Sequence, residues 1–382
     1  MTVQFRPDMA PLRSPVLIIT AGGLEHGGGI GRMIGYLTDE WHRDLAAPAF
    51  EVMDPRGPGP YWMWPRRFLA TLWRIHRRAR ECPLAYIHVA GRASTWRKLL
   101  LTAYCRLRHM PVVLHLHDND YERFCRTLPA PFLALVRWMF QTADHTIVLG
   151  EAAKRTITGL LGVPADRVSI LANAVPAPAP APAKAPAPVE ILFLGQLSRR
   201  KGVHDLIEAL DQPNMRDVQW HATIAGGGPH QETFEQQLAE TAVADRVTML
   251  GWVDRATTVS LLNRADILVL PSYAEGMAMS ILEGLAHGLC VVCTPVGAHA
   301  EVIEHGRSGL LVEPGAVSQL SEALAQTVAD GELRARLSVG AAERFRAGFD
   351  VATYPARLAP IMSMARHRRR DDRDRVELTA ER

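Results

Sequence analysis

Two glutamates, Glu275 and Glu283, flank a segment in which an extended run passes into a helix, PSYAEGMAMSILEGLAHG. Their offset of eight residues is a little over two helical turns, about 12 Å along the axis, so we expect both side chains on one face. The first turn of that helix, from Met277 to Ser280, offers backbone N–H groups that attract a diphosphate. The spacing indicates that Glu275 binds sugar hydroxyls and Glu283 binds ribose hydroxyls at the two ends of a diphosphate. Ordinary surface glutamates are the alternative.

Two histidines end another apolar run. In VVLHLHDND, the strand ends with His115, His117 and Asp118. These residues lie at the edge where open α/β sheets present ligand-facing side chains. His115 and His117 are two positions apart, so they point to the same face of the sheet. A buried structural histidine is one alternative, and a metal site built from His115, His117 and Asp118 is another.

The pattern of apolar runs predicts the elements that position these residues. Runs rich in Val, Ile and Leu alternate with amphipathic segments of helix length, as in parallel sheets that helices cover on both faces. Each half opens on a strand, then a loop, then a helix, so the sequence predicts two doubly wound α/β units. The predicted strands are 16–20, 84–89, 112–117, 145–150, 190–195, 220–226, 247–251, 266–272, 289–294 and 309–313.

A stretch of alternating proline and alanine divides the chain, because these residues disfavour helix interiors and sheet ladders and favour extended polyproline II. We predict an N-terminal domain over 1–172, a linker over 173–189 and a C-terminal domain over 190–348. Residues 349–366 are expected to form a helix. Residues 367–382 are expected to be a disordered charged tail, since they have almost nothing apolar to bury.

Charge is distributed unevenly over the 382 residues, whose formal net charge is +3. Residues 1–172 carry +8, residues 173–366 carry −6 and the remainder carries +1. A basic first half indicates an anionic partner, such as a lipid surface, a phosphorylated acceptor or a nucleic acid. The longest apolar runs fall short of the roughly 18 residues that span a membrane, and no signal peptide is recognisable, so a cytoplasmic location is expected.

The five cysteines are an odd number in a long chain, which argues against a disulfide framework. Cys290 and Cys293 form a C-x-x-C motif. The valines between them favour a buried strand over a zinc half-site or a redox pair.

The second half resembles a known family, the retaining nucleotide-sugar glycosyltransferases of family 4. Five segments match in order: LFLGQLSRRKG, IAGGGP, VTMLGWVD, ADILVLPSYAEGMAMSILEGLAHG and TPVGAHAEVIEHGRSGLLVEPG. The family signature, a Glu, seven residues and a second Glu, is matched by Glu275 and Glu283. The resemblance covers most of the chain and implies the α/β GT-B fold: two Rossmann-like, doubly wound parallel-sheet domains that face a cleft. It also implies that the helix at 349–366 packs back on the N-terminal domain.

The resemblance implies three catalytic residues: Glu275, His117 beside the transferred sugar, and Lys201, whose charge stabilises the leaving nucleoside diphosphate. A surface lysine at a helix start is the alternative for Lys201. The family usually has an Arg where this chain has Gln196, so either a neighbouring Arg compensates or donor binding relies on backbone amides. The implied donor-binding residues are Gly28, Gly29, Gly31, Gln196, Arg200, Lys201, Gly226, Gly228, Trp252, Val253, Glu275, Gly276, Met277, Ala278, Met279, Ser280 and Glu283.

Among them, Gly28, Gly29 and Gly31 belong to a glycine-rich loop after the first strand. A Cβ in this loop would block close approach to phosphates. A simple tight turn is the alternative for this loop. No metal ligands and no cofactor are expected, because the family resembles other GT-B enzymes in binding diphosphates without a required divalent ion.

Residues 61–80, YWMWPRRFLATLWRIHRRAR, combine apolar side chains at helical spacing with many arginines. This composition is typical of a helix that lies in an anionic lipid interface. The segment 96–109, WRKLLLTAYCRLRH, is a second basic amphipathic run. An ordinary helix that packs its apolar stripe on the sheet is the alternative.

The matching segments look closest to bacterial exopolysaccharide and capsule enzymes, including α-mannosyltransferases. They imply transfer of a hexose, with mannose from GDP-mannose as the first choice, to a polyprenyl-diphosphate-linked saccharide in cell-surface glycan synthesis. We expect the enzyme to be peripheral on the inner face of the cell membrane and not to bind nucleic acid.

Three alternatives stay open: a UDP-sugar donor, a nucleotide-sugar epimerase of the same fold, and a catalytically silent lipid-binding or assembly partner. A nicotinamide dehydrogenase is disfavoured because no G-x-G-x-x-G follows a strand with an acidic residue about 20 positions on.

Overall fold

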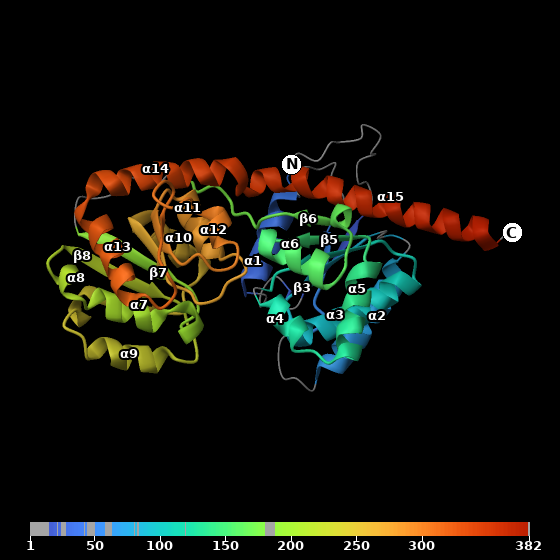
Figure 1. The fold of residues 1–382 in the computed structure, drawn as a ribbon, viewed down its shortest axis with the longest axis horizontal. Helices are drawn as coiled ribbons and strands as arrows, with labels where there is room; N and C mark the ends of the chain where they lie inside the picture. The colour runs from blue at the N-terminus through green and yellow to red at the C-terminus, as the bar shows by residue number, and fades with distance from the viewer. Residues whose placement is uncertain are drawn as a thin grey trace. The chain divides into compact units, whose positions relative to one another are not determined.

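The computed structural model describes residues 15–20, 22–23, 28–41, 43, 50–57, 63–79, 81, 84–118, 120–179 and 188–380, with side chains described up to residue 371. The chain divides into two compact units. Unit 1 comprises residues 1–173 and 351–382, and unit 2 comprises residues 174–350. Each unit contains a six-stranded parallel sheet covered by helices (Figure 1). The predicted pair of doubly wound parallel sheets is therefore confirmed.

In unit 1 the strand order is β2-β1-β3-β4-β5-β6. The residues of β1, β3, β4 and β5 are buried along their whole length, as expected of strands that helices cover on both faces. The elements are β1 (Val16–Ile19), α1 (Gly28–Trp41), β2 (Phe50–Met53), α2 (Trp64–Arg78), β3 (Ala85–Val89), α3 (Arg92–Leu107), β4 (Val112–Leu116), α4 (Tyr121–Arg126), α5 (Ala130–Thr142), β5 (His145–Val148), α6 (Glu151–Arg155), a π-helical turn (Thr156–Leu160), a 3-10 turn (Ala165–Arg167), β6 (Val168–Ile170), a 3-10 turn (Val351–Thr353) and α15 (Tyr354–Ala380).

In unit 2 the strand order is β12-β11-β10-β7-β8-β9, and every neighbouring pair is parallel. The elements are β7 (Val189–Leu194), a 3-10 turn (Arg199–Lys201), α7 (Val203–Leu210), α8 (Pro213–Arg216), β8 (Trp220–Ala225), α9 (Gln231–Ala239), a 3-10 turn (Ala244–Arg246), β9 (Val247–Gly251), α10 (Arg255–Arg264), β10 (Ile267–Leu270), α11 (Met279–Ala286), β11 (Cys290–Cys293), α12 (His299–Val302), β12 (Leu310–Leu311), α13 (Val317–Ala329) and α14 (Gly331–Gly348).

All ten predicted strands are present, whereas β2 and β6 were not predicted. Both are edge strands of the unit 1 sheet, so each pairs along one side only. Their sequences, FEVM and VSI, are short and mostly half-buried, and they lack the long apolar run that identifies a central strand. In β11, Cys290 and Cys293 are buried free thiols, as the valines between them predict.

The predicted linker, 173–189, is described only at its two ends, because residues 180–187 lie outside the described residues. At its beginning, Ala174 and Val175 are buried, and the Val175 N–H donates to the Phe349 carbonyl oxygen at 2.9 Å. The start of this segment is therefore part of the packed structure.

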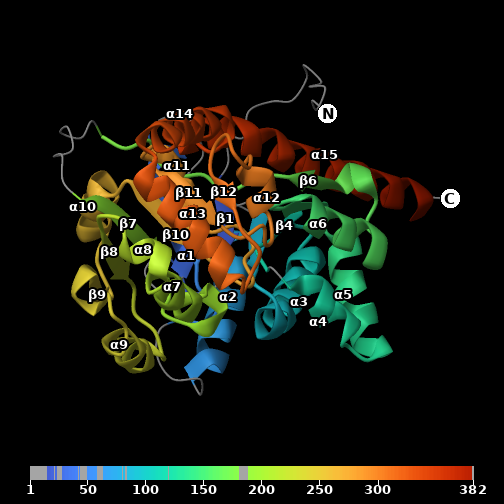
Figure 2. The ribbon, with the colours of Figure 1, turned by 60° about the vertical axis from the view of Figure 1, so that its left-hand side comes forward.

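Helix α15 belongs to unit 1, although it follows unit 2 in the chain. It contacts β4, β5 and α1, and it runs along that unit in both ribbon views (Figure 2). Its buried side chains recur at helical spacing and form the stripe that faces the sheet. The apolar ones are Tyr354, Leu358, Ile361, Met362 and Ala365, and Ser363 is also buried.

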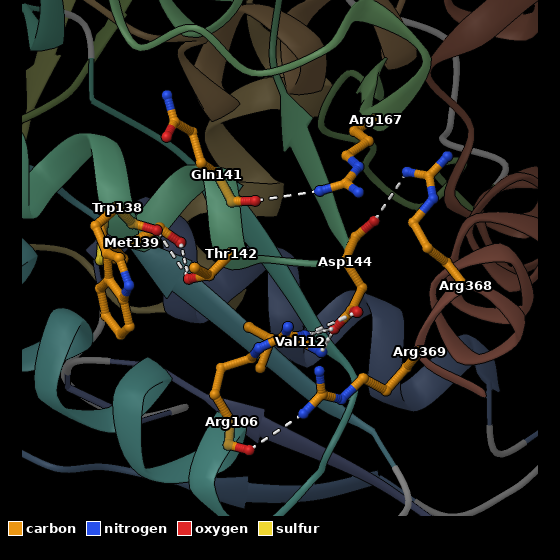
Figure 3. Close-up of polar contacts among 10 residues, drawn as sticks. All are labelled: Arg106, Val112, Trp138, Met139, Gln141, Thr142, Asp144, Arg167, Arg368 and Arg369. Carbon is orange, nitrogen blue, oxygen red and sulfur yellow. Dashed lines mark hydrogen bonds and ion pairs between the residues drawn. The ribbon is translucent and has the colours of Figure 1, made fainter. Parts of the chain in front are cut away.

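The expectation of a disordered tail over 367–382 is wrong as far as Ala380, because α15 continues to that residue. Two arginines fasten its middle to unit 1 (Figure 3). Arg368 donates to the Asp144 carbonyl oxygen at 3.2 Å and pairs with Asp166 at 2.6 Å, and Arg369 donates to the Arg106 carbonyl oxygen at 3.2 Å. Two basic residues of the tail thus have specific acceptors, which a composition argument does not reveal.

Asp144 is the centre of this polar network. Its buried carboxylate accepts two hydrogen bonds from the Arg106 guanidinium, at 3.0 and 3.1 Å, and one from the Val112 N–H at 2.7 Å. The same residue therefore ties α3, the start of β4 and the start of β5 together, and its carbonyl group receives α15.

The basic amphipathic segments divide between core and surface. In α2, Phe68 and Ile75 are buried in the core, whereas Leu69 and Trp73, one turn apart, are 63% and 58% exposed. The Arg77 guanidinium lies over the Trp73 ring, 4.8 Å from its centroid. Only part of the predicted apolar stripe is therefore available to a lipid surface.

The second basic run, in α3, contributes less surface charge than expected. Lys98 is fully buried, its Nζ donates to the Ile19 carbonyl oxygen at 3.3 Å, and burial lowers its pKa to about 7. Arg106 is committed to Asp144. Within the described part of the chain, no helix has both the length and the apolar character needed to cross a bilayer.

Replacing Asp144 by Ala is expected to lower the free energy of unfolding by about 3 kcal/mol, because it leaves the partly buried Arg106 and the Val112 N–H without their acceptor. Asp166→Ala is the matched control, since this carboxylate is 69% exposed and its pair with Arg368 is worth at most about 1 kcal/mol. Urea denaturation measures the free energy of unfolding of both variants. Equal losses in the two variants would contradict the central role of Asp144.

Candidate active site

The second sheet reverses its strand order between β7 and β10. Successive strands run outward from β7 to β9 on one side, and the chain then returns to place β10 on the other side of β7. The connections after β7 and β10 therefore leave the sheet in opposite directions, and ligands of open α/β sheets bind at the carboxyl ends of such strands. Lys201 follows β7 and Glu275 follows β10, so the topology brings together two residues that are far apart in sequence.

Lys201 and Glu275 form an ion pair in largely buried surroundings. Lys201 Nζ lies 2.6 Å from Glu275 Oε1, and their side chains are 12% and 9% exposed. Arg200 approaches the same oxygen at 3.1 Å and donates to the Ala274 carbonyl oxygen at 2.6 Å. Two cations therefore converge on one carboxylate. The side chain of Gln196 is exposed, and the second cation beside Glu275 is supplied by Arg200.

Backbone contacts fix the two loops against each other. The Tyr273 N–H donates to the Arg200 carbonyl oxygen at 2.8 Å. Gly202 has φ +69°, and a Cβ there would lie 2.0 Å from the Pro271 carbonyl oxygen. Only glycine satisfies both the left-handed backbone and the close approach. Lys201 is thus held beside Glu275 by packing as well as by charge.

Burial lowers the pKa of Lys201 from its usual value, and the charge of Glu275 opposes this shift. The Glu275 carboxylate therefore favours the charged form of the lysine at this depth, as an anionic ligand would.

His299 completes the surroundings of Glu275 and was not predicted from the sequence. Its Nδ1 donates to the Thr294 carbonyl oxygen at 3.1 Å, which leaves Nε2 to accept from the Ala278 N–H at 3.3 Å. Burial lowers its pKa to about 4, so the ring is neutral at pH 7. The signal in the sequence was its place at the start of α12, directly after the small-residue loop that follows β11, in TPVGAHAEV.

That loop also packs on the backbone of the site. Gly297 has φ +59°, and a Cβ there would lie 1.8 Å from the Glu275 carbonyl oxygen. The Ala298 N–H donates to the Gly276 carbonyl oxygen at 2.9 Å. Three strand ends, those of β7, β10 and β11, therefore contribute to one site.

The predicted helix start needs correction. Helix α11 begins at Met279 with Ala278 as its N-cap, so Glu275 precedes the helix and the two-turn spacing to Glu283 does not apply. The Ala278 N–H is engaged by His299, which leaves the first-turn N–H groups from Met279 onward to face a ligand. Glu283 is buried, like every residue of this helix.

The remaining predicted residues of unit 2 lie around the ends of β7, β8 and β9. A Cβ on Gly226 would lie 1.8 Å from the Gly195 carbonyl oxygen, and one on Gly228 would lie 2.2 Å from that of Leu197, so both glycines allow close backbone packing. Trp252 is 78% exposed, and Val253 is half-buried.

His117 and the glycines Gly28, Gly29 and Gly31 belong to unit 1 and are not among the residues brought together in unit 2. The three glycines lie in the first turn of α1 rather than in a loop. His117 lies just beyond the end of β4. The roles implied for these residues remain predictions.

Comparison with known families covers most of the chain. Residues 28–177 match the family described as Glycosyltransferase Family 4, and residues 180–344 match the family described as Glycosyl transferases group 1. The first range contains every strand of the unit 1 sheet except β1, and the second contains every strand of the unit 2 sheet.

Among curated proteins, the chain is 28% identical over 283 residues to a glycogen synthase of Mycobacterium tuberculosis, covering 72% of this chain and 68% of that protein. It is 27% identical over 179 residues to a GDP-mannose-dependent alpha-(1-6)-phosphatidylinositol monomannoside mannosyltransferase of the same organism, covering 45% of this chain and 46% of that protein.

Among solved structures, the fold is similar to a sucrose-phosphate synthase from Thermosynechococcus elongatus, with a TM-score of 0.73, 18% identity, and coverage of 91% of this chain and 98% of that one. It is also similar to HepE of Anabaena in complex with UDP, with a TM-score of 0.72, 20% identity, and coverage of 92% and 99%. At this identity, the similarity establishes the fold.

The neutral state of His299 predicts a pH dependence of stability. The folded ring protonates at about pH 4 and the unfolded ring near 6.5, so between these values the unfolded state binds more protons. The contribution of His299 is therefore complete above about pH 6.5 and is lost as pH falls toward 4, by about 3 kcal/mol in total. We expect His299→Gln to flatten the decline in unfolding free energy between pH 7.5 and pH 4.5, measured by urea denaturation.

His76→Gln is the control, because His76 is an exposed side chain on α2. We expect the decline in unfolding free energy to be flatter in His299→Gln than in this control. An unaltered slope in His299→Gln would show that this ring is not held neutral.

Proposed function

Because the chain belongs to the glycosyltransferases of the GT-B type, we propose that it transfers a hexose from a nucleotide sugar to an acceptor with retention of anomeric configuration. The observation that supports this most directly is the convergence of Lys201 and Arg200 on Glu275 at the strand reversal of unit 2. In this proposal the two cations and the first-turn amides of α11 bind the diphosphate and stabilise its charge as the glycosidic bond breaks.

Glu275 has a distinct role in the proposed reaction. When a diphosphate occupies the site, it supplies negative charge to Lys201 and Arg200, so the carboxylate becomes free to accept hydrogen bonds from sugar hydroxyls. Glu283 binds the ribose hydroxyls. Attack by the acceptor on the face that the diphosphate leaves accounts for retention. In this proposal, protein side chains and backbone amides carry out the transfer, and no divalent ion takes part.

GDP-mannose is the proposed donor. The similarity to a mannosyltransferase that is named as GDP-mannose-dependent supports this choice. The UDP complex of HepE, whose fold is similar, supports the competing choice of a UDP sugar. No residue described in unit 2 distinguishes guanine from uracil by itself, so the base must be identified by binding.

The proposed acceptor is a polyprenyl-diphosphate-linked saccharide at an anionic membrane surface, in exopolysaccharide or cell-surface glycan synthesis. Helix α2 supports it, since Leu69 and Trp73 are exposed beside the exposed Arg77. Apolar burial and attraction to anionic headgroups act together on such a helix. The proposed location is therefore peripheral, on the inner face of the cell membrane.

Thermal stabilisation by UDP, GDP, ADP and their sugars tests the donor site. A ligand at 100 times its Kd stabilises the folded state by about 2.7 kcal/mol, and we expect GDP and GDP-mannose to produce the largest rise in Tm, with and without EDTA. A selective response to UDP would change the donor and keep the reaction class. A shift with none of the nucleotides would contradict transfer itself.

The same proposal predicts how three variants differ. Lys201→Ala and Glu275→Ala should reduce turnover at least about 100-fold, as loss of transition-state charge stabilisation does, whereas Glu283→Ala should mainly weaken donor binding by about tenfold. Glu240→Ala, at an exposed position after α9, is the matched control. Wild-type rates in Lys201→Ala and Glu275→Ala would exclude the assigned site, and an inverted product in an NMR assay would exclude retention.

Membrane association gives a separate prediction. Replacing Arg74, Arg77 and Arg78 by Ala should weaken binding to phosphatidylglycerol vesicles by about fivefold for each arginine that faces the headgroups, at about 1 kcal/mol each. Arg74 and Arg78 pair with Glu51, so Arg77 should account for most of the loss. Co-sedimentation with vesicles measures the binding.

The apolar part is tested with Leu69→Ser and Trp73→Ser, which should also weaken vesicle binding. Val339→Ser is the matched control, because Val339 is a 61% exposed apolar residue on α14 of unit 2. Equal sedimentation of the wild type and all variants would rule out α2 as the lipid-binding helix.

A further inference from the structure

Three histidines of unit 1 form a compact cluster at the carboxyl ends of two central strands. His88 in β3 and His115 in β4 are directly opposite each other in the parallel register, so their side chains share a face of the sheet. His117 follows β4. The ring centroids of His115 and His117 are 4.0 Å apart, and those of His88 and His117 are 5.0 Å apart.

The hydrogen bonds of this cluster are incomplete. His88 Nδ1 and His117 Nε2 are 2.8 Å apart, and His115 Nδ1 is 2.6 Å from the Tyr86 hydroxyl. Of the three remaining ring nitrogens, His88 Nε2 and His115 Nε2 are buried and have no hydrogen-bond partner. A buried polar atom without a partner costs about 1–3 kcal/mol, so the cluster carries an unmet requirement for a ligand.

We propose that His88, His115 and His117 form a binding site for a divalent transition-metal ion of the zinc type. One ring nitrogen from each histidine lies within 4.8 Å of the other two. Three nitrogens bound to Zn²⁺ at 2.0–2.1 Å are about 3.4 Å apart in a tetrahedral arrangement. Side-chain rotations that move the ring nitrogens by about 1 Å therefore complete the site.

The chemistry of the donor set defines the class of ion. Three imidazoles without a carboxylate or thiolate suit Zn²⁺, Cu²⁺, Ni²⁺ and Co²⁺ rather than Mg²⁺ or Ca²⁺, which prefer oxygen ligands. A three-histidine set also leaves one position open on a tetrahedral ion. His88 and His115 are fully enclosed and His117 is half-buried, so an ion enters from the side of His117.

This site differs from the metal alternative considered from the sequence, which combined His115 and His117 with Asp118. The structure replaces Asp118 with His88, which comes from the neighbouring strand and lies 27 residues earlier than His115. The sheet register, which is a tertiary property, brings the third ligand into place. The proposed site shares His117 with the sugar-binding role that the family resemblance implies for that residue, whereas the transfer reaction itself is proposed to need no divalent ion.

Titration of the full chain with Zn²⁺ tests the proposal. The protein is stripped with a chelator, and Zn²⁺ binding is measured by calorimetry at pH 8, where imidazoles are neutral and able to coordinate. We expect one equivalent of Zn²⁺ per chain. Substituting Co²⁺ should produce the visible absorption bands of a tetrahedral nitrogen site. Absence of a stoichiometric site in folded protein would overturn the proposal and leave the cluster as a hydrogen-bonded imidazole stack.

Variants identify the ligands. His88→Gln and His117→Gln should each weaken Zn²⁺ binding at least about 100-fold, since loss of a ligand exceeds the 10- to 100-fold loss caused by altering its supporting residues. His145→Gln is the matched control, because His145 is a buried histidine of the same sheet that lies outside the cluster. Unchanged affinity in the two ligand variants would contradict the assignment. If His88→Gln fails to fold, the half-buried His117→Gln decides the result.

Discussion

The carboxyl ends of β7 and β10 lie side by side because the strand order of the second sheet reverses between them. This constraint places Lys201 within 2.6 Å of Glu275, although the two residues are separated by more than seventy positions. Glycines whose Cβ atoms would collide with neighbouring carbonyl groups then allow the loops to close on each other. The chemistry of the site thus depends on a topological feature of a buried sheet, and backbone packing positions the side chains together with their own ion pairs.

The central strands could be predicted because burial on both faces requires long runs of Val, Ile and Leu, and the glutamates because they follow such a run at a recognisable interval. The pairing of Ala278 with His299 could not, since it joins residues 21 positions apart through a loop of small residues. The helix start was misplaced for the same reason, because the Ala278 N–H donates to His299 and Ala278 has an extended backbone, so the helix begins only at Met279. Local spacing carries no information on such tertiary contacts.

The distribution of charge along the sequence gave an incomplete account of the surface of unit 1. Lys98 is buried and Arg106 is committed to Asp144, so neither contributes to an exposed basic face. The charged segment beyond residue 366 was interpreted as solvated, yet Arg368 and Arg369 have specific carbonyl and carboxylate acceptors. The same holds in unit 2, where the cations of the site, Arg200 and Lys201, pair with Glu275. Net charge by segment therefore describes composition, and only the pairing of each group shows which charges face a ligand.

Helix α15 also affects how the chain acquires its structure. Residues 1–173 leave the ribosome first, but the apolar stripe that packs on β4 and β5 follows the whole of unit 2. The first unit therefore waits for the second to be synthesised before its own core is covered, and during that interval part of its sheet is open to water and to other chains. Separating the two units by cutting the gene between them would leave the first without this helix.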